Sequence, residues 1–226
     1  SFDNVSYCYP GNNNYALENV SFNISQGEII GISGDSGAGK TTCIDLLLGF
    51  LRPSKGEIKY NENVVIKNNN IDKFQEKIGY IPQDIFIVND TIRNNIIFDN
   101  ENKFDDVLLD MALTTSNLHK FINSLQKGNN TFLSESGFNI SGGQKQRISI
   151  ARALYHNREI LILDESTNAL DEKTERNIID EINLMKKFKT IIIISHNYKI
   201  LDICDKIIVF NEGKIKQIDT YKNILH

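Results

Sequence analysis

Apolar residues recur along this chain with two periods, and the change of period separates predicted strands from predicted helices. In the first part of the chain, short apolar or alternating runs predict β-strands at 2–9, 18–24, 28–33, 56–61 and 77–83. From about 91 to 126 the apolar residues recur every three or four positions, which predicts helices. The chain therefore begins with a part rich in β-strands, which a helical insert follows.

The second half of the chain alternates helices with strands. The pattern predicts helices at 141–155 and 172–187, strands at 159–164 and 190–195, and a hairpin of 206–210 with 213–219. Such alternation predicts an α/β fold with a mainly parallel sheet, an N-terminal antiparallel β subdomain and an inserted α-helical subdomain. We expect a single domain over 1–226, with parts at 1–90, 91–155 and 156–226.

Composition and charge limit the classes of protein to which this chain can belong. With 40% apolar residues among 226, the chain can bury a substantial core, and its net charge of −4 argues against a dedicated nucleic-acid binder. The three cysteines lack the spacing of a disulfide framework or a zinc site. The longest apolar run has the length of a strand, far below the roughly 18 residues that span a bilayer. Because the chain starts with Ser1 rather than Met, we expect that it was cut from a longer polypeptide.

A glycine-rich loop at 34–42 lies between a predicted strand and a predicted helix at about 40–50. It matches the phosphate-binding pattern G-x-x-x-x-G-K-[ST] in full. Backbone N–H groups of 36–41 and the positive end of the helix dipole would face a β-phosphate. Lys40 would neutralise β- and γ-phosphate oxygens, and the Thr41 hydroxyl would ligate Mg²⁺. The pattern predicts a nucleoside triphosphate site on a P-loop core.

Two acidic residues end the predicted strand at 159–164, where open α/β sheets place their ligands. Asp164 would hold Mg²⁺ through water, and Glu165 would act as the general base for the attacking water. The alternative is an acidic pair on a surface turn. The two carboxylates nevertheless favour hydrolysis of the bound triphosphate.

The stretch 139–154 carries the most specific sequence. Ser141, Gly142, Gly143 and Gln144 can form a second anion-binding turn at the start of a helix. They resemble the signature motif of the ATP-binding-cassette (ABC) family, with Ile140 where Leu is usual. The resemblance implies that two such domains pack head to tail, so that the signature of one closes over the γ-phosphate held by the other. A plain helix cap is the alternative, and we expect it to leave Gln144 without a role.

The resemblance covers nearly the whole chain and implies further roles. Tyr9 matches the aromatic residue that stacks on adenine, and Gln83 matches the glutamine that senses Mg²⁺ and water and touches a membrane partner. His196 stands in the place of the switch histidine that contacts the γ-phosphate, and the loop 168–171 resembles one that crosses to the opposite monomer. The alternatives are a surface tyrosine, a polar loop glutamine, a structural histidine and, for Asp171, a helix N-cap.

The expected site has three sets of residues. The nucleotide-binding set is Tyr9, Gly34, Asp35, Ser36, Gly37, Ala38, Gly39, Lys40, Thr41, Thr42, Ser141, Gly142, Gly143 and Gln144. The catalytic set is Glu165, His196, Gln83 and Lys40, and the Mg²⁺ set is Thr41, Gln83 and Asp164. Because each assigned chemical group is present, the resemblance implies a competent ATPase that uses ATP and Mg²⁺.

Glu135 and Gly137, just before the signature, resemble the loop of exporters that contacts the membrane domain. The resemblance thus implies an ATPase that powers a half-transporter for peptide, lipid or lipid-linked oligosaccharide, on the cytoplasmic face of the inner membrane. Its implied partners are a second such domain, as a homodimer, and a transmembrane domain of the same polypeptide, without nucleic acid.

Two alternatives stay open. One is a soluble ABC ATPase of the translation or DNA-repair type, for which a tandem cassette or a coiled-coil insertion would be expected. The other is a domain that binds nucleotide without hydrolysing it, for which Glu165 or His196 would be expected to be absent.

Overall fold

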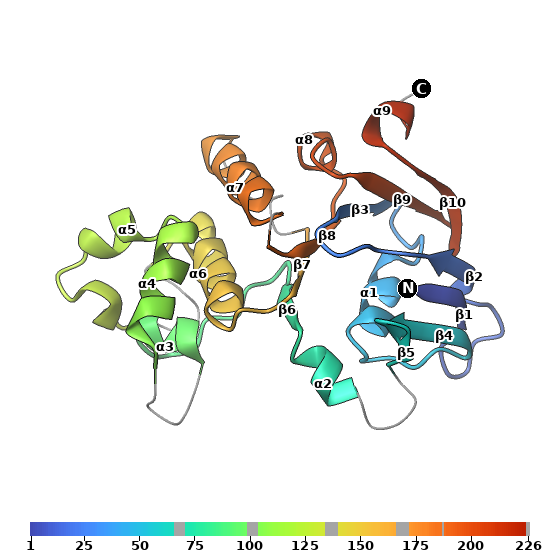
Figure 1. Cartoon of the computed structure of the whole chain (residues 1–226), viewed down its shortest axis with the longest axis horizontal. Coiled ribbons are helices and arrows are strands. Elements are labelled where there is room, and N and C mark those ends of the chain that lie inside the picture. Colours follow the sequence, from blue (N-terminus) through green and yellow to red (C-terminus); the bar gives the residue numbers. More distant parts are fainter. Residues whose placement is uncertain (66–70, 99–103, 134–139, 166–171, 187, 225–226) are drawn as a thin grey trace. The chain divides into compact units, whose positions relative to one another are not determined.

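The computed structural model describes residues 1–65, 71–98, 104–133, 140–165, 172–186 and 188–224. The chain divides into two compact units, of which unit 1 comprises Ser1–Ile78 with Lys186–His226 and unit 2 comprises Gly79–Met185. Figure 1 labels their helices and strands. Each unit is described separately.

Unit 1 contains an antiparallel sheet with the strand order β2-β1-β4-β5. Its strands are β1 (Phe2–Tyr7), β2 (Leu17–Phe22), β4 (Lys55–Tyr60) and β5 (Asn63–Val64). Leu17, Val20 and Phe22 are the buried residues of β2, which has one face on a core, and an irregularity in its pairing with β1 interrupts the alternation. The rings of Phe2 and Phe22 stack across β1 and β2 with centroids 4.5 Å apart.

Unit 1 also contains strands in the order β10-β9-β3-β8. They are β3 (Ile29–Gly34), β8 (Thr190–Ile194), β9 (Lys206–Asn211) and β10 (Lys214–Asp219). Strand β3 pairs in parallel with both β8 and β9, and β10 returns antiparallel to β9. All five residues of β8 are buried, which suits a parallel strand covered on both faces. The helices of this unit are α1 (Lys40–Leu47), α2 (Ile71–Gln75), α8 (Tyr198–Leu201) and α9 (Tyr221–Ile224).

Unit 2 is mainly helical. It contains the neighbouring strands β6 (Ile78–Ile81, whose first residue closes unit 1) and β7 (Ile160–Asp164). The helices are α3 (Ile92–Ile97), α4 (Asp106–Thr115), α5 (His119–Asn123), the 3₁₀ turn η1 (Gly128–Asn130), α6 (Gly142–Tyr155) and α7 (Glu172–Met185).

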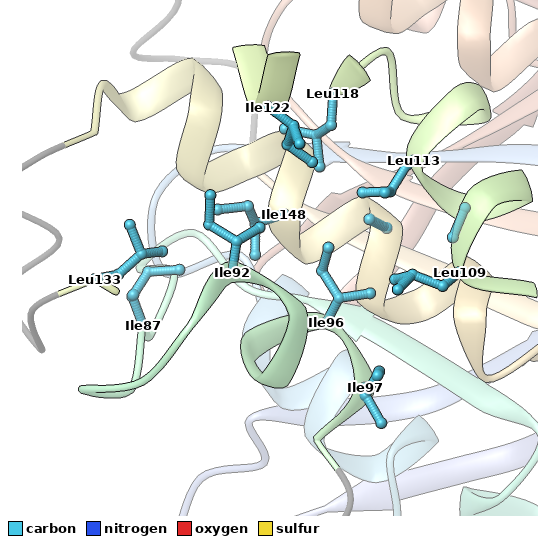
Figure 2. Close-up of a cluster of buried hydrophobic side chains, with 12 residues drawn as sticks. Ile87, Ile92, Ile96, Ile97, Leu109, Leu113, Leu118, Ile122, Leu133 and Ile148 are labelled. Carbon is cyan, nitrogen blue, oxygen red and sulfur yellow. The ribbon is translucent and has the colours of Figure 1, made fainter. Parts of the chain in front are cut away.

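The core of the helical part of unit 2 is aliphatic (Figure 2). Ile92 and Ile96 of α3, Leu109 and Leu113 of α4 and Ile148 of α6 all belong to one buried cluster. Their spacing of four residues places each pair on one helix face. The helical period seen in the sequence between 91 and 126 thus identifies the faces that form this core.

The expected α/β fold, with its antiparallel β part, mainly parallel sheet and helical insert, is confirmed. The helical stretch is divided more finely than its period indicates, because Thr91 and Asp105 cap new helices with their side chains. The predicted helix at 40–50 ends earlier, at Leu47, and Gly49 follows with φ of 76°. The expected parts 1–90, 91–155 and 156–226 stay a prediction.

Candidate functional site

The glycine-rich loop of unit 1 joins β3 to α1. Gly34, Gly37 and Gly39 have φ of 145°, 79° and 105°, a region that residues with a Cβ rarely adopt. A Cβ on Gly34 would lie 2.4 Å from the carbonyl oxygen of Phe210 on the paired strand β9. Gly39 is the N-cap of α1 and has no side chain to bond the first N–H groups of the helix. Those N–H groups are the donors that a phosphate would use.

Lys40 lies at the first position of α1 with only 8% of its surface exposed. Its Nζ donates to the carbonyl oxygens of Gly34 at 2.7 Å and of Asp35 at 3.0 Å. An ammonium group has three N–H donors, so the third can serve a ligand. Both partners are neutral carbonyl groups, and among the described residues no carboxylate pairs with Lys40, so burial makes an anion favourable at this place.

Two segments, 16–17 and 211–213, pack behind the glycine-rich loop. A Cβ on Gly39 would lie 2.7 Å from the Leu17 side chain and 3.0 Å from the carbonyl oxygen of Ala16. A Cβ on Gly213 would lie 2.7 Å from the same carbonyl oxygen, and the Gly213 N–H donates to Ala38 at 3.0 Å. The hairpin turn at 211–213 therefore braces the loop. In the sequence this glycine predicted only a turn, and nothing local connects it with Ala16.

His196 lies at the same sheet edge as the start of the loop. Ile32 of β3 pairs with Ile194 of β8, and the Ser195 N–H donates to the Ile32 carbonyl at 3.2 Å. Strand β3 ends at Gly34, two residues after this pair, and His196 stands two residues after Ile194, the last residue of β8. The imidazole is exposed, and Asn197 beside it caps α8. The register thus places both motifs at the carboxyl ends of adjacent strands.

Tyr9 follows β1 and reaches the helix of the phosphate loop. Its phenolic oxygen lies 3.1 Å from Oγ1 of Thr42, the third residue of α1. The structure thus brings Tyr9 to the loop, whereas its contact with a base stays a prediction.

In unit 2, the acidic residues stand at the end of β7. The Tyr80 hydroxyl, on the neighbouring strand β6, donates to Asp164 Oδ2 at 2.9 Å. This bond, which the sequence pattern did not reveal, orients one carboxylate oxygen. Glu165 has φ of 43°, a left-handed conformation that is strained for a residue with a side chain. Gln83 lies in the exposed segment after β6.

The predicted signature forms the start of α6. Ser141 is its N-cap: Ser141 Oγ accepts from the Gln144 N–H at 3.3 Å, and Gln144 Oε1 accepts from the Ser141 N–H at 2.8 Å. The expectation that a helix cap leaves Gln144 without a role is therefore wrong, because serine and glutamine form a reciprocal capping box. A Cβ on Gly142 would meet no atom of the described residues within 4 Å, so α6 begins at a position that these residues leave sterically open.

Arg152 of α6 binds both the segment after Gln83 and helix α3. Arg152 Nε donates to the Asn95 carbonyl at 2.8 Å and Nη2 to the Phe86 carbonyl at 3.3 Å, while its guanidinium lies 4.6 Å from the ring centroid of Phe98. Burial lowers the pKa of Arg152. The Asn95 side chain is fully buried and bonds the main chain at Val88 through both its oxygen and its nitrogen. Sequence reasoning identified neither residue.

A buried ion pair joins α6 and α7. Arg147 Nη1 lies 3.4 Å from Glu181 Oε1 and also donates to the carbonyl groups of Ser116 and Asn117. Burial raises the pKa of Glu181 to about 7, Arg147 opposes this shift, and Asp180 adds to it. The pair therefore contains a carboxyl group that titrates near neutral pH.

Several predicted residues lie outside the described ones, namely Glu135, Gly137 and the loop 168–171 with Asn168 and Asp171. Among the residues that are described, no three His, Cys, Asp or Glu side chains form a cluster suited to a metal ion. In the same part of the chain, no helix is both long and apolar enough to cross a bilayer.

Comparison with known proteins agrees with this geometry. The family model described as "ABC transporter" matches residues 17–168. The ATP-dependent lipid A-core flippase of Haemophilus ducreyi is 35% identical over 225 residues, which cover 100% of this chain after rounding and 38% of the relative. A probable multidrug resistance ABC transporter ATP-binding/permease protein of Bacillus subtilis is 38% identical over 224 residues, 99% of this chain and 38% of the relative.

A solved structure of a bacterial Atm1-family ABC exporter with ATP bound aligns with a TM-score of 0.91 and 32% identity. The alignment covers 99% of this chain and 39% of the exporter chain, so the chain spans well under half the length of these relatives. The family match includes the glycine-rich loop, the acidic strand end and the signature turn. The chain belongs to the ABC transporter family, whose domain binds ATP.

Proposed function

We propose that this chain is the ATP-hydrolysing domain of an ABC exporter. The observation that carries the proposal is the buried Lys40 ammonium, which donates to two carbonyl groups at the start of α1. The first N–H groups of α1 lie beside it and have no side-chain cap. A triphosphate carries the negative charge that would pair with the Lys40 ammonium and accept from these N–H groups. The named relatives, a lipid A-core flippase and a multidrug ABC transporter, favour an exporter.

In this proposal the residues divide the chemistry. Lys40 and the loop N–H groups bind β- and γ-phosphate, and Tyr9 stacks on adenine. The Thr41 hydroxyl and the Asp164 carboxylate are hard oxygen donors of the kind that Mg²⁺ accepts beside phosphate and water. Mg²⁺, when bound, would neutralise phosphate charge. Glu165 accepts a proton from the attacking water, and His196 and Gln83 orient it.

The signature turn is proposed to serve a second nucleotide. Ser141 caps the start of α6 through the Gln144 N–H, and the N–H groups of Gly142 and Gly143 beside it are the proposed donors to that nucleotide. Two copies packed head to tail would each place Ser141 over the γ-phosphate that the other copy holds. ATP then favours the closed pair because it contacts both copies, and hydrolysis releases it.

A membrane domain is the second proposed partner, on the cytoplasmic face of the inner membrane. Unit 2 exposes the aromatic rings of Phe86 and Phe132, at 61% and 57%. Two main-chain bonds connect their segments, from the Leu133 N–H to the Asp90 carbonyl and from the Ile92 N–H to the Thr131 carbonyl. Exposed aromatic rings of this kind suit a protein interface. Peptide, lipid and lipid-linked oligosaccharide are the proposed substrate classes.

The test is phosphate release by the purified chain in Mg²⁺-ATP, measured over a range of chain concentrations. We expect Glu165→Gln to lower the rate at least about a hundredfold, because general-base catalysis contributes about 10²–10⁴. Glu159→Gln, an exposed residue that directly precedes the same strand, is the control and should hydrolyse normally. The rate per chain should rise with concentration. Normal hydrolysis by Glu165→Gln would refute the role of the base, and a rate per chain independent of concentration would refute assembly in pairs.

A further inference from the structure

The hydroxyl groups of Tyr9 and Thr42 form a bond that sequence motifs do not predict. Their oxygens are 3.1 Å apart although the residues are 33 positions apart in the chain. Thr42 is nearly buried, at 6% exposure, whereas Tyr9 exposes 37% of its surface. A tyrosine with this exposure could leave its hydroxyl in water. Here the tip of the ring is attached to α1, two residues after Lys40.

The rest of Tyr9 is also held in place. Its ring meets the buried Tyr7 ring edge-on, at a centroid distance of 5.0 Å and an interplanar angle of 85°. The chain after it turns back through a bond from the Asn12 N–H to the Tyr9 carbonyl at 3.0 Å. Cys8 Sγ lies 2.9 and 3.2 Å from the carbonyl oxygens of Asn12 and Asn14, which share its one proton. The ring is thus fixed at its tip, its edge and its backbone.

The bond to Tyr9 leaves Thr42 able to serve a phosphate. A threonine hydroxyl has one proton to donate and two lone pairs to accept with. A phosphate oxygen only accepts, so Thr42 can donate to it while accepting the proton of the Tyr9 phenol. One hydroxyl group can therefore connect the base side and the phosphate side of a nucleotide.

We propose that Thr42 is a positioning residue, which holds the Tyr9 ring at a fixed place relative to the phosphate loop. The inference rests on the proposed function, since it concerns the same nucleotide. The aromatic ring and the loop then form one pre-organised surface for a nucleoside triphosphate, and ordering of the ring costs nothing at the moment of binding. A ligand without a base gains nothing from this arrangement.

The experiment compares affinities for Mg²⁺-ATP and for Mg²⁺-tripolyphosphate, which has the phosphates without the base. The variants are Tyr9→Phe, Thr42→Val, the double variant and Tyr15→Phe. Tyr15 is the matched control because it is equally exposed, at 38%, and its ring lies against Lys55 rather than α1. The chain has no tryptophan, so a fluorescent ATP analogue gives a clean displacement signal.

We expect Tyr9→Phe to weaken ATP binding about fivefold, the effect of one hydrogen bond, and to change tripolyphosphate binding by less than twofold. In the Thr42→Val background the same change should have no further effect, and Tyr15→Phe should bind as the parent chain does. A loss of folding would lower both affinities together, which circular dichroism would reveal.

Unchanged ATP affinity in Tyr9→Phe would overturn the inference, as would an equal loss for both ligands or an undiminished effect in the Thr42→Val background. If the parent chain binds neither ligand, the proposed function itself fails. The two failures are distinguishable, because failure of the proposed function shows in the parent chain, whereas failure of the inference shows in the variants of a parent chain that binds ATP.

Discussion

Asn95→Ala tests how much one buried amide contributes to unit 2. Asn95 is fully buried; its Oδ1 accepts from the Val88 N–H at 2.9 Å, and its Nδ2 donates to the carbonyls of Val88 and Thr91 at 3.0 Å each. Both carbonyls keep another main-chain donor, from Asp90 and from Asn95 itself. The Val88 N–H donates to Asn95 Oδ1, and no second acceptor for it is seen among the described residues.

The expected cost follows from these contacts. One orphaned donor costs about 1–3 kcal/mol, and each remaining bond has a net value of about 0.5–1.5 kcal/mol. Because Val88 is only half-buried, the lower part of these ranges applies, and we expect a loss of about 3 kcal/mol in the free energy of unfolding. Asn94→Ala is the control, since Asn94 is exposed and, among the described residues, its side chain donates to Asp90 Oδ1 alone.

The assay is urea denaturation followed by far-UV circular dichroism, with hydrogen exchange at the Val88 amide as a local measure. Asn94→Ala should stay within about 0.5 kcal/mol of the parent chain, as is usual for surface substitutions. If the two alanine variants differed by less than about 1 kcal/mol, the reasoning from buried amide bonds would be wrong.

Three further predictions concern other residues. Arg152→Lys keeps the charge but loses the planar fork that reaches two carbonyl groups and a ring, so urea denaturation should show a loss of about 2 kcal/mol; an unchanged midpoint would contradict this. Glu181 in the native state keeps a proton up to about pH 7 that the unfolded chain loses near 4.5. The unfolding free energy of the parent chain minus that of Glu181→Gln should therefore fall as pH rises through this window and then stay level, and a constant difference in pH-dependent urea titrations would disprove it. Gly39→Ala brings a Cβ to 2.7 Å from Leu17 at a φ of 105°, so ATP affinity should fall at least about tenfold, and normal binding would show that the loop tolerates a side chain.

The sequence predicted the features that depend on neighbouring residues. The loop at 34–42 follows from a contiguous motif between a strand and a helix, and the buried strand β8 follows from four consecutive isoleucines after Thr190. The hairpin of β9 and β10 follows from its turn residues. In each of these cases local chain chemistry decides the structure, so a single sequence is sufficient.

Contacts between distant residues could not be predicted in this way. In the sequence, Asn95 looks like an ordinary polar residue of a short amphipathic helix. Only the fold brings its side chain into hydrogen-bonding contact with Val88, in the segment after Gln83. Tyr80 alternates with apolar neighbours, and nothing nearby indicates its bond to Asp164. The role of Gln144 was predicted from a motif, whereas its side chain is engaged in the cap of its own helix.

The pairing of β3 has a consequence for folding during synthesis. Both strands that pair with β3 come from residues after 189, and the Ile29 N–H is bonded to the Asp205 carboxylate, 176 positions later. The ribosome makes the phosphate-loop motif early, but its strand gains partners only after all of unit 2 has been synthesised. Contacts of such high sequence separation form slowly, because a long segment must be closed first. The motif that is most evident in the sequence is therefore among the last parts of the nascent chain to reach its final shape.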